Sequence, residues 1–167
     1  DDDIMFRSIR MDKYLPGGDQ LLSFERGIST IKGPVFQSGI GRVQNLEATR
    51  PFTRFNYSNK NWNVLAHFSS RDGDQVNLVE ALATDFALKT QEKRYGAEAQ
   101  WHSEFGGGRG RVVVGGSYTH EYVNSFDPDT GRQTVLWEPV DTDREALFGQ
   151  ADWSLNKYFK LVGAARM

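Results

Sequence analysis

The stretch FGQADWSLNKYFKLVGAARM (residues 148–167) alternates two kinds of side chain on both sides of a short Asn-Lys sequence. Every second residue from Leu147 to Leu155 is apolar or glycine, and the same is true from Phe159 to Met167. A period of two is typical of a strand with one apolar face. Only a tight turn fits between the two runs, so the pattern predicts an antiparallel hairpin that turns at 156–157.

The same alternation predicts two more hairpins upstream. In each, a short polar or glycine-rich sequence separates two runs with a period of two. The paired runs are 51–57 with 62–70, turning at 58–61 (SNKN), and 95–105 with 112–122, turning at 106–110 (GGGRG). Residues 51–167 are therefore expected to form three hairpins of an all-β fold.

Long segments join these hairpins, at roughly 71–93 and 124–144. Part of 85–93 could continue a strand, and the leucines and phenylalanine of NLVEALATDF (77–86) are also spaced for a helical turn. Short turns at one end and long links at the other are the layout of an outer-membrane β-barrel. We therefore expect antiparallel hairpins of a transmembrane β-barrel, with short turns in the periplasm and long links outside.

The placement of aromatic residues favours a bilayer over a soluble core. A β-sandwich needs bulk at the centre of its core, whereas lipid-facing strands carry aromatic girdles at both interfaces and small residues between them. On the apolar face the aromatic residues are Tyr57, Trp62, Trp101, Phe105, Trp153 and Phe159 near the short turns, and Phe68, Tyr95, Tyr118 and Tyr122 at the far ends. We expect Ala97, Ala99, Gly149, Ala151, Gly163 and Ala165 to face outer-membrane lipid, and Glu98, Gln100, Gln150 and Asp152 to face a hydrated or plugged lumen.

The closing hairpin resembles one that recurs in the barrels of TonB-dependent outer-membrane receptors. Phe148, Gln150, Asp152 and Trp153 match its descending strand, and Leu161, Gly163 and Arg166 match its ascending strand. The resemblance implies a 22-stranded barrel with an N-terminal plug and a TonB box, in the outer membrane of a Gram-negative bacterium. It also implies uptake of a scarce nutrient (a siderophore, metal complex, glycan or peptide) energised by TonB, ExbB and ExbD.

Residues 1–50 are expected to be an extracellular loop or an earlier strand. FERGISTIKGP (24–34) and GIGRVQNLEATRP (39–51) are faintly similar to the end of a plug. However, a strand that descends through 51–57 starts outside the cell, whereas a plug joins its barrel from the periplasm. Six predicted strands cannot close such a barrel and Met167 is not a terminal aromatic, so we expect a segment of a larger barrel. A porin-like barrel and a soluble β-sheet adhesin or binding module are the alternative hypotheses.

Motifs for chemistry are sparse. DPDTG (127–131) begins like a calcium loop but lacks the closing glutamate, so we expect a turn shaped by its proline and glycine. His67, His102 and His120 lie on different predicted strands without metal-ligand spacing. The chain has no cysteine, and its formal net charge of −2 with mixed signs gives no electrostatic case for nucleic acid. We predict no enzyme, no cofactor and no metal site.

Ligand contacts are expected in the long outward links, where outward loops commonly carry binding residues. Arg71, Asp72 and Asp74 lie in the first link, and Trp137 stands among polar neighbours in the second. These four residues are the candidate ligand-binding residues.

Overall fold

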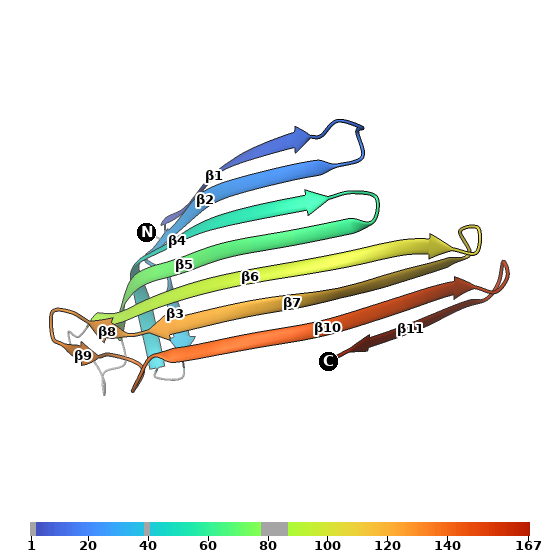
Figure 1. The fold of residues 1–167 in the computed structure, drawn as a ribbon. Helices are drawn as coiled ribbons and strands as arrows, with labels where there is room; N and C mark the ends of the chain where they lie inside the picture. Colours follow the sequence, from blue (N-terminus) through green and yellow to red (C-terminus); the bar gives the residue numbers. More distant parts are fainter. Residues whose placement is uncertain (1–2, 39–40, 78–86) are drawn as a thin grey trace.

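A computed structural model describes residues 3–38, 41–77 and 87–167 as one large antiparallel sheet with a small two-stranded ribbon at one end (Figure 1). The large sheet has the order β1-β2-β4-β5-β6-β7-β10-β11, with β3 paired to β4, and β8 and β9 form the ribbon. The strands are β1 (Asp3–Tyr14), β2 (Leu21–Lys32), β3 (Val35–Ser38), β4 (Gly41–Ser58), β5 (Trp62–Asn77), β6 (Ala87–Phe105), β7 (Gly110–Asn124), β8 (Phe126–Asp127), β9 (Arg132–Gln133), β10 (Val140–Ser154) and β11 (Lys160–Arg166). Within the described ranges, no helical segment has the length and hydrophobicity needed to span a bilayer. The expected all-β class is confirmed.

The three predicted hairpins are confirmed, because β4 pairs with β5, β6 with β7 and β10 with β11. The backbone conformation of the GGGRG turn explains why it is rich in glycine. Gly106, Gly107 and Gly108 have φ angles of +62°, +68° and +85°, a region that glycine enters without steric cost. A fourth hairpin, β1–β2, precedes these three and turns between Tyr14 and Leu21. All four short turns lie at the same end of the sheet (Figure 1).

Strands β5 and β6 run farther than the sequence predicted. Their pairing continues without a break from Trp62↔Trp101 to Val76↔Ala87, so much of the link expected at 71–93 is strand. Beyond the bilayer both faces of a hairpin meet water, and the apolar–polar alternation can disappear while the backbone pairing continues. The helical turn suggested in 77–86 lies outside the described residues, apart from Asn77 at the end of β5.

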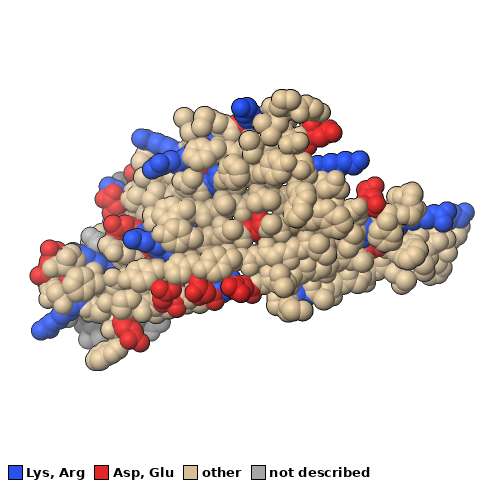
Figure 2. Space-filling view, in the orientation of Figure 1, with Lys and Arg blue, Asp and Glu red and all other residues tan. Residues whose placement is uncertain are grey.

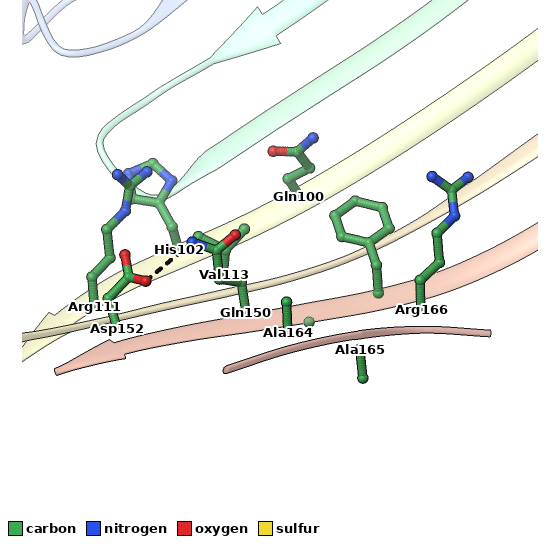
Figure 3. A pocket seen from close by; sticks show the side chains of 11 residues that line it. Gln100, His102, Arg111, Val113, Gln150, Asp152, Ala164, Ala165 and Arg166 are labelled. Carbon is green, nitrogen blue, oxygen red and sulfur yellow. Dashed lines mark hydrogen bonds between the residues drawn. The ribbon is translucent and has the colours of Figure 1, made fainter. Parts of the chain in front are cut away.

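Register divides the side chains between two faces, because directly paired residues lie on the same side of a sheet. One row runs from Trp101 through Val114 and Gly149 to Ala165, across four strands. All six residues expected to face lipid lie on this apolar face, and the four expected to face the lumen lie on the opposite, polar face. Figure 3 shows the same division in β11, where Ala165 points away from the side that carries Arg166.

The sheet buries almost no apolar side chain of its own. Among the described residues, only Val43, Ala48 and Leu88 are buried and apolar. Leu147 and Leu161, on the apolar face, are 63% and 61% exposed. A soluble domain of this size buries a contiguous core, so this apolar face needs a further layer to cover it. A β-sandwich would cover this face with a second large sheet, which the described residues do not form.

The sheet is open. β1 pairs only with β2, and β11 pairs only with β10, so each leaves one row of backbone groups without a strand partner in the described part of the chain. The curved sheet in Figure 1 is therefore a section of wall rather than a closed barrel.

Candidate functional site

Four arginines gather on the polar face, toward the end of the sheet that lies away from the short turns. Arg50 and Arg54 come from β4, Arg71 from β5 and Arg94 from β6. They line a pocket of about 350 Å³, which we call the arginine pocket. Every second side chain of a strand lies on the same face, so the spacing of four residues alone places Arg50 and Arg54 on one face of β4. The other two join them through strand register.

The register places like charges directly opposite one another. The β4–β5 pairing runs in one register from Thr49↔Asp72 to Phe52↔Ser69, which sets Arg50 opposite Arg71. Like charges directly opposite each other in a sheet are destabilising. Beside them, Ser69 pairs with Arg94 and Arg71 pairs with Glu92.

An aromatic pair forms part of the pocket lining. The rings of Phe6 and Phe52 are stacked with their centroids 5.8 Å apart. The guanidinium carbon of Arg54 lies 5.4 Å from the centroid of Phe52, a cation–π distance. Arg54 also lies 3.9 Å from a carboxylate oxygen of Glu25. These contacts orient Arg54 but leave most of its hydrogen-bonding edge free for water or a ligand.

Arg71 and Arg94 each contain a buried donor without an acceptor. The Nε atom of each side chain is shielded from solvent and has no hydrogen-bond partner. Burial, together with the charge of Arg50, lowers the pKa of Arg71 from its usual value. A buried donor left unpaired costs free energy, and among the described residues the buried side-chain donors without a partner are those of Arg71 and Arg94.

A second pocket on the polar face, of about 660 Å³, lies closer to the short turns (Figure 3). The carboxylate of its lining, Asp152, is already paired. Gln150 donates to Asp152 at 3.1 Å, and Lys160 lies 3.3 Å from the same carboxylate. Arg111 and His102 point to the same side of the sheet. This pocket is a mixed polar lining rather than a concentration of one charge.

The ribbon β8–β9 is fixed to β6 by an ion-pair cluster. Lys89 lies 2.9 Å from Asp127 and 2.8 Å from Asp129. Asp127 also accepts from the hydroxyl of Thr130 and the backbone N–H of Asp129. Lys89 is the main cause that lowers the pKa of Asp127 to about 2. The DPDTG sequence is a turn, as predicted, and its first carboxylate is occupied by a lysine.

The predicted ligand residues do not form one site. Arg71 lines the arginine pocket, whereas Asp72 follows it in β5 and lines a different pocket on the apolar side with Lys89. Asp74 is also a strand residue, because its backbone pairs with Lys89. The expectation that these three lie in a loop is therefore wrong, since β5 continues through them. Trp137 does lie in a loop, between β9 and β10, and is 96% exposed.

His120 is brought close to two acidic residues that sequence spacing did not reveal. Its Nδ1 atom lies 3.0 Å from Asp143 and 3.4 Å from Asp141, and Tyr118 donates to Asp143 at 2.6 Å. His120, Asp141 and Asp143 offer ligand atoms within 4.8 Å of one another. They belong to the apolar face, and Figure 2 shows the row of acidic side chains along β10. The β7–β10 register creates this group.

The arginine pocket was also missed from the sequence. The available signal was Arg54 in the predicted strand 51–57, with Arg50 four residues earlier. Both lie on one face of β4, which begins before the predicted strand. The other half of the pocket depends on the registers of β4 with β5 and of β5 with β6. No local pattern gives those registers in strands that are polar on both sides.

Comparison with known proteins agrees with this architecture. A family model described as TonB dependent receptor-like, beta-barrel, matches residues 4–167. Comparison with curated proteins and with solved structures found no match. The matched region covers nearly all of β1 and every later strand, and its sheet has the apolar face with aromatic ends and the charged opposite face that a barrel wall requires. The chain belongs to the TonB-dependent receptor β-barrel family, whose members are outer-membrane transport proteins of Gram-negative bacteria.

Proposed function

We propose that this chain is part of the wall of an outer-membrane receptor that imports a scarce nutrient with energy from TonB, ExbB and ExbD. This proposal rests on the family match to a sheet that has one apolar and one polar face and buries almost no apolar side chain. The nutrient is a siderophore, another metal complex, a glycan or a peptide. The apolar face contacts outer-membrane lipid, and the polar face lines the lumen.

Further strands complete the barrel, to the 22 implied by the family resemblance. The open edges of β1 and β11 support this part of the proposal. In hydrocarbon, each unpaired backbone group costs several kcal/mol, so an open edge is not tolerated there. The described part of residues 1–50 then belongs to the barrel rather than to the end of a plug, since β1, β2 and β4 are neighbours in one sheet.

The solute meets the polar face at its outward end. β5 and β6 extend by several residues beyond the aromatic pair Phe68 and Tyr95, whose rings lie 4.9 Å apart on the apolar face. Arg71 lies in this extension. The arginine pocket is therefore near the outer mouth of the lumen, and the exposed Trp137 lies in a loop at the same end of the sheet.

The test is energy-dependent uptake by the complete receptor. A strain that lacks the receptor gene is compared with its parent on limiting siderophore-bound iron, other metal complexes, glycans and peptides, with and without TonB. We expect one nutrient class to support growth only when receptor and TonB are both present. Receptor-dependent uptake that persists without TonB would instead support a porin-like protein and refute the proposal.

A further inference from the structure

We infer that the arginine pocket binds an anionic group of the imported solute, such as a carboxylate, phosphate or sulfate. This inference rests on the proposed function and specifies the chemical class of its substrate. It begins with charge. Four guanidinium groups line the pocket, together with two carboxylates, those of Glu25 and Glu92.

The two carboxylates offset only part of this charge. Glu25 is 3.9 Å from Arg54, close to the outer limit of an ion pair. Glu92 is the register partner of Arg71, yet it leaves the Nε atom of Arg71 without an acceptor. Glu121 is the register partner of Arg94, but it is 3.0 Å from Arg144. The pocket therefore carries net positive charge.

The two unpaired Nε–H groups are donors of the kind that an oxyanion accepts from. Arginine presents its N–H groups as a rigid planar fork, which carboxylate and phosphate groups bind with two parallel hydrogen bonds. Arg71 and Arg94 come from adjacent strands, two residues out of direct register, and each has a buried Nε donor without a partner. An anion on the polar face of these two strands would accept from both and offset the repulsion between Arg50 and Arg71.

The size of the arginine pocket and its apolar wall suit a group of a solute better than bulk water. The volume of about 350 Å³ accommodates several heavy atoms, and the stacked rings of Phe6 and Phe52 give one wall an apolar surface. Binding pockets commonly combine apolar surface with a few convergent polar groups. An anionic group attached to an apolar or aromatic body fits this combination.

The test uses the complete receptor, purified in detergent, with citrate and inorganic phosphate as probes against chloride at constant ionic strength. Two-dimensional NMR of the arginine Nε–H groups reports the site directly. We expect citrate or phosphate to shift two Nε–H signals that disappear in Arg71→Gln and Arg94→Gln. We also expect each substitution to weaken probe binding about tenfold, as the loss of a charge-assisted hydrogen bond predicts.

Arg111→Gln is the matched control, because Arg111 lies on the same face in the other pocket. It should leave probe affinity unchanged, and equal weakening in all three variants would show diffuse attraction and overturn the inference. If a glutamine variant fails to fold, Arg71→Lys and Arg94→Lys keep the charge while removing Nε, and they should still lose the corresponding signal and affinity. Lysine variants that bind both probes as tightly as the parent would refute the site.

The binding measurement is independent of energy coupling. A receptor that imports its nutrient with TonB but shows no probe-dependent shift of the two signals refutes the anion inference and leaves the proposed function intact. A receptor that binds the probes at Arg71 and Arg94 but supports no TonB-dependent uptake refutes the proposed function.

Discussion

Replacing Ala99 with arginine should strongly destabilise the receptor, whereas the same change at the next residue should not. Ala99 lies in β6 on the apolar face, four residues from Tyr95, two from Trp101 and six from Phe105. A rise of about 3.3 Å per residue and a tilt near 45° put Ala99 close to the bilayer midplane. Its paired neighbours are Val64 and Gly116, which offer no counter-charge.

The expected cost follows from this depth. Arginine on the lipid face of a barrel costs about 2–4 kcal/mol at the midplane, which is about a 25- to 700-fold loss in the folding equilibrium. Gln100→Arg is the matched control, because Gln100 lies on the polar face. It should change stability by about 0.5 kcal/mol or less, as an ordinary polar-surface substitution does.

The assay is urea-dependent refolding of the complete receptor into lipid vesicles, read by the shift of the folded band on unheated gels. The assignment of faces would be wrong if Gln100→Arg were the more damaging change. It would also be wrong if the two variants unfolded at the same urea concentration.

Three other results are expected. Gly115→Ala would place a methyl group 2.5 Å from the ring of Phe148 and 2.7 Å from a backbone oxygen, so it should lower the folding stability by about 1–3 kcal/mol in the same refolding assay. Gly149→Ala is the control, because its nearest neighbour would be at 3.7 Å, and it should cost little stability. Equal losses of stability in the two variants would contradict the packing. Cysteines at Ala151 and Gly163 should react with a lipid-soluble reagent and those at Gln150 and Asp152 with a water-soluble one, and aqueous labelling of both pairs would refute lipid contact. Lys89 lowers the pKa of Asp127 to about 2, so the stability that their ion pair adds to the folded state should be complete above the unfolded pKa of about 3.9 and be lost as the pH falls through about 2. Asp127→Asn should speed proteolysis of the loop after β9 at neutral pH. Cleavage of this variant as slow as in the parent would show that the ion pair does not hold the ribbon.

The hairpins within the bilayer could be predicted because a membrane imposes a simple rule. Trp101, Ala99 and Ala97 alternate with polar residues, as expected of a barrel strand that has one side toward lipid and the other toward the lumen. A one-residue slip would move all of them to the wrong face. Glycine-rich or short polar turns then fix the ends of each strand.

The same reasoning explains where prediction failed. Arg71 and Asp72 are consecutive polar residues, which resemble a loop when no face is apolar, although their backbones pair with Glu92 and Gln91. Alternation reports a difference between two environments, and that difference disappears beyond the lipid. The sequence therefore indicates the membrane-spanning part of each strand better than the whole strand.

At the outer end of the sheet, acidic and basic side chains lie on opposite faces. Asp141, Asp143 and Glu145 of β10 lie on the apolar face, while the arginine pocket lies on the polar face. Both groups come from strands that alternate sides at every residue, so a modest overall charge of −2 hides two local charges of opposite sign. Clefts lined by one sign of charge concentrate ions of the other sign. Under the proposed function and the anion inference, we therefore expect the acidic residues of β10 to repel an anion that approaches the outer end, and the arginine pocket to attract it toward the lumen.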